Sequence, residues 1–208
     1  MQLKEKRFTT DILVIGGGFA GVFAAIRVKE QGFDVILVDK GAVGRSGQTP
    51  WVDSFHVFDE EKGHTREKWI NAVNDKGEGI NNIGFLDMLM YDSKSIFEEL
   101  KGWGAVNNSR FGIILDRKVK EYGVDVISRT MITNLIKKND RVVGAMGFPL
   151  DEEKTSIIIN AKAVINCAGA GSYKAHGFPI QGLTFDGDAI SYRVGAEIVG
   201  KELNDFHF

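Results

Sequence analysis

Apolar residues in the first forty positions follow two different periods, separated by a run of glycines. Residues 11–15 and 34–38 are short, mostly apolar runs, and each predicts a buried strand. Between them, residues 19–31 place apolar side chains at helical spacing, and Gly32 follows as a stop signal. A strand, a helix and a second strand in this order make a βαβ unit, whose strands run parallel. The sequence therefore predicts a parallel sheet with a helix packed on it.

The pattern beyond residue 41 predicts more helices and two kinds of strand. Helices are expected at 65–73, 85–101, 111–122 and 186–194. Strands are expected at 124–127 and 162–166 in the main sheet, and at 131–138, 141–148 and 155–159 in an antiparallel group. Residues 41–62 have no clear period and are expected to form an extended loop near a site. Together these elements predict an α/β fold in a single domain covering 1–208, with a small antiparallel insertion at 131–160 packed on the sheet edge.

Composition and charge narrow the classes of function. The chain has 208 residues and a formal net charge of −2, which gives no electrostatic case for binding nucleic acid or anionic membranes. Its apolar stretches are short and interrupted by glycine, so we expect neither a membrane span nor a signal peptide. A single cysteine, Cys167, leaves no partner for an intrachain disulfide and fits a reducing compartment. We therefore expect a cytoplasmic protein.

Three glycines between the first strand and the first helix carry the clearest chemistry. Gly16, Gly18 and Gly21 have the G-x-G-x-x-G spacing, which is weak evidence alone but here has a strand before it and a helix after it. The first glycine permits the tight turn, the second lets the backbone touch a pyrophosphate, and the third lets the helix pack closely. The helix N-terminus then directs free N–H groups at the phosphates. A βαβ corner without a ligand is the structural alternative.

Asp39, at the end of the second strand, indicates which dinucleotides fit. A carboxylate at this place can accept hydrogen bonds from both ribose hydroxyls, and it would repel a 2′-phosphate. This argues against NADP and leaves NAD and FAD open. The alternative is that Asp39 only caps the end of the strand.

Three later segments resemble the fumarate reductase/succinate dehydrogenase flavoprotein family. The first is Asp39-Lys40 with Gly-Arg-Ser-Gly-Gln-Thr at 44–49, the second is Ile-Asn-Cys-Ala-Gly-Ala-Gly at 165–171, and the third runs from Thr-Phe-Asp-Gly at 184–187 through Arg193-x-Gly195-Ala196 and Glu202 to Phe206-His207. The resemblance covers the chain in order. It implies a Rossmann-like FAD-binding domain, and FAD as the cofactor.

The resemblance also assigns cofactor contacts. The expected contacts are Gly16, Gly18, Phe19, Ala20 and Gly21 with the diphosphate, Asp39 with the adenosine ribose and Lys40 beside it, Ser46, Gln48 and Thr49 along the ribityl chain and flavin, the backbone at Ile132 near adenine, Ala168, Gly169 and Ala170 close to the cofactor, and Asp186 beneath it. Hydroxyl, amide and backbone N–H groups suit a neutral, oxygenated ring. A polar surface loop is the alternative for 46–49, and a helix N-cap is the alternative for Asp186.

Several positions depart from the family pattern. Gln48 stands where membrane-bound members carry the histidine that bonds covalently to FAD, and an amide is not a nucleophile. We therefore expect non-covalent FAD. Asp53-Ser54-Phe55 replaces a Gly-Gly pair near the flavin edge, Phe185 replaces a glycine, and Phe208 replaces a proline. These changes leave open whether the fumarate/succinate reaction itself carries over.

Catalytic residues are not assignable from the sequence. His207 lines up with a histidine that binds a substrate carboxylate in the family, but a penultimate residue is also commonly solvated. The sequence ends where family members enter a capping domain that supplies the proton donor. We therefore keep three hypotheses: part of a fumarate reductase-like enzyme with a small-molecule substrate and an external electron donor, a flavin-binding polypeptide that needs a partner chain, or a flavin-binding module without catalysis. A missing cap predicts self-association or a partner contact.

Overall fold

The computed structural model describes residues 4–52, 54–105, 110–171 and 183–200, and it divides the chain into two compact units. The first unit combines Met1–Trp51 with Phe111–Phe208, and the second is Val52–Arg110. Each unit is described by itself. The residues singled out at 53 and 202–208, among them His207, lie outside the described part of the chain.

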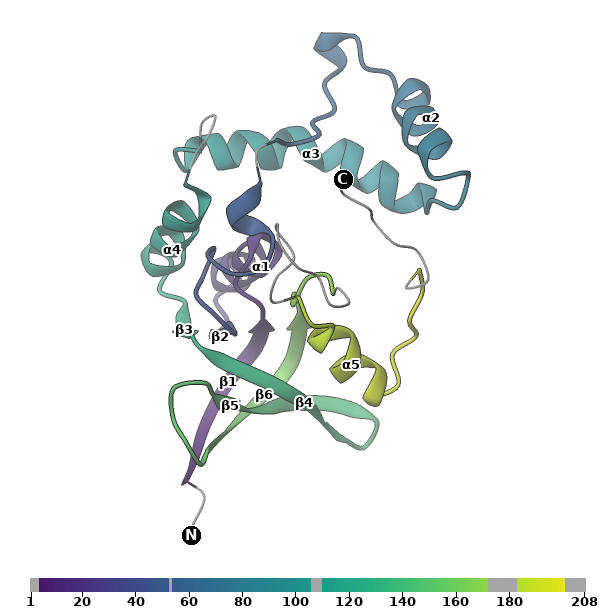
Figure 1. Ribbon diagram of the computed structural model, residues 1–208. Coiled ribbons are helices and arrows are strands. Elements are labelled where there is room, and N and C mark those ends of the chain that lie inside the picture. The colour runs from purple at the N-terminus through teal and green to yellow at the C-terminus, as the bar shows by residue number, and fades with distance from the viewer. Residues whose placement is uncertain (1–3, 53, 106–109, 172–182, 201–208) are drawn as a thin grey trace. The chain divides into compact units, whose positions relative to one another are not determined.

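The first unit contains a six-stranded mixed sheet (Figure 1). Its strands are β1 (Lys4–Ile15), β2 (Val35–Val38), β3 (Asp125–Ile127), β4 (Thr130–Lys138), β5 (Arg141–Pro149) and β6 (Thr155–Asn166), in the order β3-β2-β1-β6-β5-β4. β1 pairs in parallel with β2 and β6, and β2 pairs in parallel with β3. β5 pairs antiparallel with both β6 and β4. The predicted α/β fold, with a parallel core and an antiparallel segment, is confirmed.

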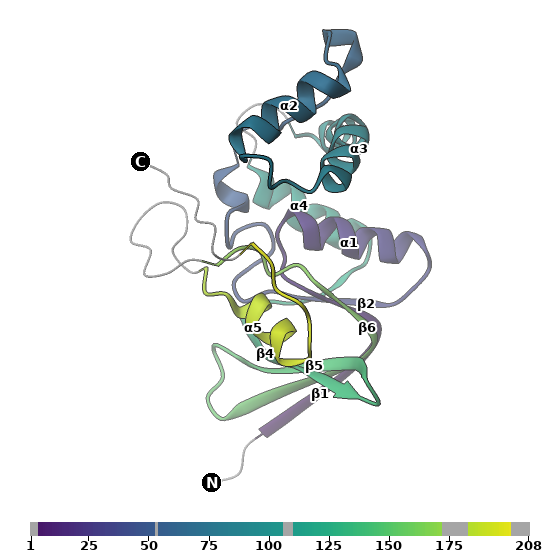
Figure 2. The ribbon, with the colours of Figure 1, turned by 90° about the vertical axis from the view of Figure 1, so that its right-hand side faces the viewer.

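The described residues of this unit form three α-helices. They are α1 (Phe19–Glu30), α4 (Phe111–Glu121) and α5 (Asp186–Arg193), and a short 3-10 helix, η1 (Thr49–Trp51), follows the loop after β2. α1 contacts β1, β2, β6 and α4, whereas α5 contacts β4 (Figure 2). α1 buries Val22 and Ile26, and Gly32 follows its end with a φ of +81°, a left-handed conformation that glycine adopts without strain. The apolar period of the sequence therefore predicted this helix correctly.

The second unit is helical. It contains η2 (Glu60–Lys62), α2 (Arg66–Lys76) and α3 (Ile83–Gly102). Thr65 and Asn82 cap the two longer helices, because their side-chain oxygens accept hydrogen bonds from the N–H groups of Lys68 and Phe85. The Arg66 guanidinium donates two hydrogen bonds, both of 2.7 Å, to the carboxylate of Asp87, and so ties α2 to α3.

The prediction of two separate strands at 155–159 and 162–166 is wrong, because β6 is continuous through both ranges. Its whole length pairs with β1, from Lys4 opposite Thr155 to Ile15 opposite Asn166. The first half of β1 was not predicted as strand, since its residues are charged and mostly exposed and so carry no hydrophobic period. The antiparallel strands β5 and β4 are consequently hydrogen-bonded into the main sheet through β6 and extend it at one edge.

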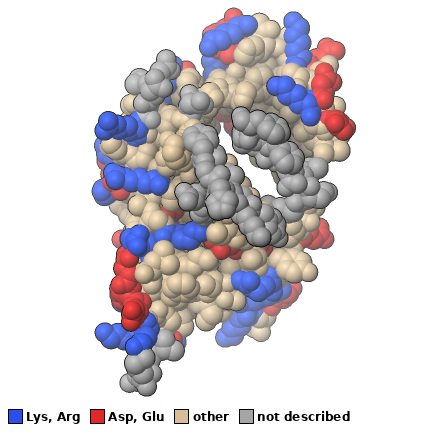
Figure 3. Space-filling view, in the orientation of Figure 1, with Lys and Arg blue, Asp and Glu red and all other residues tan. Residues whose placement is uncertain are grey.

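The core of the first unit lies around the parallel strands and the buried face of α1. Its fully buried members include Leu13, Val14, Val22, Ile26, Leu37, Val38 and Ile159. Opposite charges are interspersed on the face shown in Figure 3, so the cationic side chains visible there do not gather into one stripe. Among the described residues, no helix has both the length and the apolar character to cross a membrane.

Replacing Leu13, which is fully buried in β1, should destabilise the first unit. Leu13→Ala removes buried methyl groups and leaves a cavity, so we expect the free energy of unfolding to fall by about 2–5 kcal/mol. Leu150, which is 44% exposed in the same unit, is the matched control, and Leu150→Ala should change stability by less than about 0.5 kcal/mol. Urea unfolding of both variants measures the difference. Equal losses would contradict the assignment of the core.

Candidate functional site

The carboxyl ends of β1, β2 and β6 meet at one edge of the sheet. Ile15 stands opposite both Val38 and Asn166 in the two parallel pairings. The pairing continues one residue further, because the N–H of Gly16 donates to the Val38 oxygen over 2.8 Å and the N–H of Cys167 donates to the Ile15 oxygen over 2.7 Å. Both glycine-rich turns and the residue after β2 are therefore brought to the same edge, where parallel sheets usually bind ligands.

The three glycines of the first turn occupy places that have no room for a side chain. Gly16 has a φ of +104°, and a Cβ there would lie 2.3 Å from the Cys167 oxygen. A Cβ on Gly21 would lie 1.7 Å from the Gly16 oxygen, so this glycine lets α1 pack on the turn. A Cβ on Gly18 would lie 2.9 Å from the Thr49 Oγ1. The turn is therefore a cradle of bare backbone.

The N-terminus of α1 is polarised but carries no acid of its own. Gly18 is the N-cap and provides no side-chain cap, and the first turn contains no acidic residue. The N–H of Phe19 donates to the Thr49 Oγ1 over 3.3 Å. The exposed Ala20 follows in the first turn. A helix end of this kind has a partial positive charge and N–H groups that favour an anion.

Asp39 is buried and its carboxylate is held by three donors. Oδ2 accepts from the N–H of Gly17 over 2.6 Å. Oδ1 accepts from the N–H of Gly41 over 2.7 Å and from the Ser46 hydroxyl over 2.6 Å. An ionised carboxylate has about four acceptor positions, so Oδ2 keeps capacity for one more donor. The side chain is thus fixed against the first glycine turn, as a group that recognises a sugar hydroxyl requires.

The loop after β2 turns two of its predicted residues inward and one outward. The Ser46 hydroxyl bonds to Asp39, and the buried Thr49 bonds to the start of α1, whereas Gln48 is exposed. Ser46 therefore holds the Asp39 carboxylate, and Thr49 holds the start of α1. Their predicted contacts with the ribityl chain and flavin stay predictions.

Phe111 and Gly112, at the start of α4, were not singled out from the sequence, and they pack against α1 and the loop after β2. A Cβ on Gly44 would lie 2.6 Å from the Gly112 Cα, so the loop and the start of α4 touch backbone to backbone. The N–H of Gly44 also donates to the Gly17 oxygen over 2.7 Å. The ring of Phe111 meets the ring of Phe19 edge to face, with centroids 5.2 Å apart. In the sequence, the only sign of these contacts is a Phe-Gly pair at the start of a helix. Such a pair belongs to no cofactor motif.

The second glycine turn follows β6 and is open. Gly169 has a φ of +76°, and apart from its own chain neighbours no described residue lies within 4 Å of the place of its Cβ. Gly169 and Ala170 are exposed, and Ala168 is half-buried. This turn therefore offers accessible backbone beside the first one. Ile132, in contrast, lies in the core cluster of the sheet, so a contact with adenine there would come from its backbone, as predicted from the sequence.

Asp186 begins α5 and is paired with Lys40. The Lys40 ammonium donates to the Asp186 Oδ2 over 2.8 Å and to the Thr184 hydroxyl over 2.7 Å. Burial alone would raise the pKa of Asp186, but hydrogen bonds from Lys40 and Thr184 and the Lys40 charge outweigh it and lower that pKa. Asp186 is therefore ionised at neutral pH. It is not the N-cap of α5, a place that Phe185 takes.

Phe185 explains a departure of the sequence from its family pattern. It has a φ of +56°, in the left-handed region that glycine adopts freely and that costs a phenylalanine about 1–2 kcal/mol. Its ring lies over Gly171, where a Cβ would come within 2.1 Å of it. Phe185 therefore has the left-handed backbone conformation that a glycine would adopt at this position, and its ring packs on the second glycine turn.

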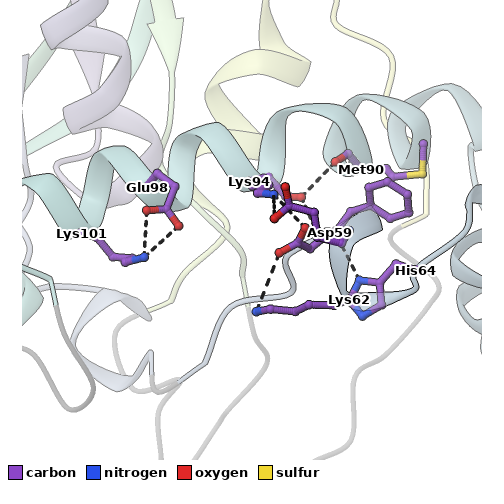
Figure 4. Close-up of polar contacts among 10 residues, drawn as sticks. Asp59, Lys62, His64, Met90, Lys94, Glu98 and Lys101 are labelled. Carbon is purple, nitrogen blue, oxygen red and sulfur yellow. Dashed lines mark hydrogen bonds and ion pairs between the residues drawn. The ribbon is translucent and has the colours of Figure 1, made fainter.

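A hollow of about 290 Å³ lies in the second unit, and its charged groups are mutually satisfied (Figure 4). Lys94 and Lys62 pair with Asp59, and Lys101 pairs with Glu98. The hydrogen bond from Lys94 lowers the pKa of Asp59 below its usual value, although burial opposes this. Within the described ranges, no group of three residues could hold a metal ion. None of the residues predicted to bind a dinucleotide lines this hollow.

Comparisons with known proteins agree with this geometry. The family model described as FAD dependent oxidoreductase matches residues 11–177. An uncharacterized FAD-dependent oxidoreductase of Methanocaldococcus jannaschii is 28% identical, over 95% of this chain and 42% of the relative. One polypeptide of the fumarate reductase (CoM/CoB) of Methanothermobacter marburgensis is 24% identical, over 99% of this chain and 43% of the relative.

The chain therefore spans less than half the length of these curated relatives. Among solved structures, the open conformation of a flavocytochrome c3 fumarate reductase superposes with a TM-score of 0.82 at 21% identity, over 91% of this chain and 41% of that one. This likeness confirms the resemblance to fumarate reductase and succinate dehydrogenase flavoproteins at the level of the fold. The matched family model covers most of the chain, which thus belongs to the FAD-dependent oxidoreductase family.

Proposed function

We propose that the chain binds FAD non-covalently and serves as the flavin domain of a fumarate reductase-like oxidoreductase, which transfers hydride between the reduced flavin and a small organic substrate. The observation that carries the proposal is the backbone cradle from Gly16 to Gly21, with the fixed carboxylate of Asp39 beside it. The cradle suits a diphosphate and the carboxylate suits a ribose hydroxyl. A 2′-phosphate would be repelled by the buried carboxylate of Asp39.

The residues present fit FAD at each of these points. Gly18 and the first turn of α1 would hold the diphosphate, and Asp39 would bind the adenosine ribose. The open backbone at Gly169 and Ala170 would lie along the cofactor. When bound, the flavin supplies the two-electron chemistry, while the protein supplies binding, orientation and electrostatics.

Non-covalent binding is supported by the side chains around the loop. Gln48 carries an amide, which does not attack a flavin. Burial raises the pKa of the Cys167 thiol, so this group stays protonated at neutral pH and is a poor nucleophile. The hydroxyls of Ser46 and Thr49 are engaged with Asp39 and Phe19.

A cofactor-holding part without turnover of its own is the second candidate. The observation in its favour is that the chain matches only 42–43% of the length of its curated relatives. In that case a second polypeptide supplies the substrate contacts and the proton donor, and this chain must bind that polypeptide for turnover. The substrate and the electron donor of the whole protein are proposals under both candidates.

Acid precipitation tests how the cofactor is held. The purified chain, saturated with FAD, should be yellow and show flavin absorption bands. After precipitation with acid, we expect the flavin in the supernatant, because no covalent bond retains it. A yellow pellet after washing would contradict non-covalent binding, and a chain that never takes up FAD would overturn the proposed function.

Replacing Asp39 should weaken FAD binding. Asp39→Asn keeps the size but removes the charge that accepts hydrogen bonds, and a hydrogen bond to a charged group contributes about 1.5–3 kcal/mol. We expect the Kd for FAD, measured by quenching of flavin fluorescence, to rise about 10- to 100-fold. Asp125, exposed on β3 in the same unit, is the matched control, and Asp125→Asn should leave the Kd unchanged. Equal effects of the two variants would remove Asp39 from the site.

Anaerobic reoxidation separates the two candidate functions. The FAD-loaded chain is reduced with dithionite, and the excess reductant is removed. If this chain transfers hydride by itself, fumarate or a related unsaturated acid should restore the oxidised flavin spectrum much faster than buffer alone. A flavin that stays reduced with every such acid would support the candidate that lacks turnover.

A further inference from the structure

We propose that Lys40, Thr184 and Asp186 form a latch that holds the start of α5 against the loop after β2, and so sets the spacing between the two glycine turns. We call these three residues the α5 latch. The inference rests on the proposed function, because both turns are expected to hold FAD. It makes Lys40 a positioning residue, which acts through Asp186 and the backbone around it.

The latch joins segments far apart in the sequence. Lys40 directly follows Asp39. Thr184 and Asp186 stand on either side of Phe185, the N-cap of α5. The ammonium lies 2.7 Å from the Thr184 hydroxyl and 2.8 Å from the Asp186 Oδ2, and Thr184 also donates to that carboxylate. Only 25% of the Asp186 side chain is exposed, so the pair is less screened than a pair in open solvent.

Each end of the latch is next to a residue that contacts one of the two glycine turns. On one side, Asp39 precedes Lys40 and accepts from the N–H of Gly17. On the other side, Gly187 follows Asp186 and packs on Ala168, because a Cβ on Gly187 would lie 2.7 Å from the Ala168 Cβ. A movement at the start of α5 is therefore transmitted to the second turn.

Asn166 reinforces the second of these connections. Its amide nitrogen donates to the Gly187 oxygen and to the Ser191 hydroxyl, both over 2.9 Å. Its amide oxygen accepts from the N–H of Ala168 over 3.2 Å. The end of β6, the second turn and the start of α5 are thus one hydrogen-bonded group, and the latch connects this group to the loop after β2.

The strained residue of the segment lies between the two acceptors of the latch. Phe185 has a left-handed backbone, which phenylalanine adopts only when its surroundings impose it. Thr184 before it and Asp186 after it are both bonded to Lys40. The latch therefore holds Phe185 in this conformation, with its ring on Gly171. Without the latch, relaxation of Phe185 would withdraw the ring and displace the turn.

The far end of α5 is held independently. The Lys137 ammonium donates to the Val194 oxygen over 2.9 Å, and the Arg193 guanidinium donates to the Thr133 oxygen. Both donor–acceptor pairs join the C-terminal end of the helix to β4. Loss of the latch should consequently loosen the start of α5 without unfolding the domain.

Lys40→Met tests the latch, with Lys162→Met as the matched control. Lys162 pairs with Asp11 over 2.6 Å in the same unit but contributes to neither turn. We expect Lys40→Met to raise the Kd for FAD about tenfold, equivalent to about 1.4 kcal/mol, and Lys162→Met to leave it within about twofold. Lys40→Arg keeps the charge and should recover most of the affinity.

Hydrogen exchange of the FAD-free protein distinguishes positioning from direct contact. Lys40→Met should speed exchange of the amides at 187–190, whereas a residue that only touched FAD would leave exchange in the free protein unchanged. The double variant Lys40→Met/Asp186→Asn should have the same Kd for FAD as whichever single variant has the higher Kd, because both changes break the same set of contacts. Thr184→Val, which keeps the ion pair, provides a milder variant if Lys40→Met does not fold.

The possible failures are separable. If the unmodified chain does not bind FAD, the proposed function fails. If it binds FAD but Lys40→Met behaves as Lys162→Met in both affinity and exchange, the latch is overturned. Weaker binding without faster exchange would also overturn it, because Lys40 would then act on the cofactor directly. Additive losses in the double variant would show that Lys40 and Asp186 act separately.

Discussion

The carboxylate of Asp39 is the contact on which the candidate site depends. It accepts hydrogen bonds from the backbone of Gly17 and Gly41 and from the Ser46 hydroxyl. These donors come from the first glycine turn and from the loop after β2, so one buried charge fixes both. A buried carboxylate is tolerated only when donors compensate the loss of water, and here the N–H groups of Gly17 and Gly41 and the Ser46 hydroxyl provide them. The same fixed charge is available to a ribose hydroxyl.

The sheet brings this contact to its place. The long parallel pairing of β1 with β6 sets the two glycine turns side by side, and β2 delivers Asp39 next to the first of them. Around this edge the structure uses backbone contact where side chains would separate the segments, at Gly21 against Gly16 and at Gly44 against Gly112. A site made largely of backbone would suit a diphosphate and a sugar, and would leave substrate selection to other parts of a protein. This division agrees with a flavin domain that shares its fold with enzymes of different substrates.

The family relationship and the geometry support different parts of the functional conclusion. The matched family model establishes that the chain belongs to the FAD-dependent oxidoreductase family, whereas the geometry suggests how this chain would hold the cofactor. Within the described residues, the candidate site is built from groups suited to binding and orientation, such as Asp39 and Thr49. Lys40 and Phe185 add a device for spacing the two turns, and neither belongs to the dinucleotide motif. The proposal of hydride transfer therefore goes further than the structure of the site, and turnover measurements decide it.

The sequence by itself determined the elements whose hydrophobic period is strong, and the residues whose chemistry is local. It predicted α1, the buried strand β2 and the glycine turn. Helical spacing, short apolar runs and the glycines of a tight turn can all be recognised from residues that are close in the sequence. Only the tertiary structure decided that β6 is one strand, since the polar half of β1 that completes it has no apolar period. It also decided the partner of Lys40, because a contact between residues 40 and 186 depends on how β2 and α5 are placed by the sheet. Local physics specifies elements and motifs, whereas pairing across more than a hundred residues is specified by the fold.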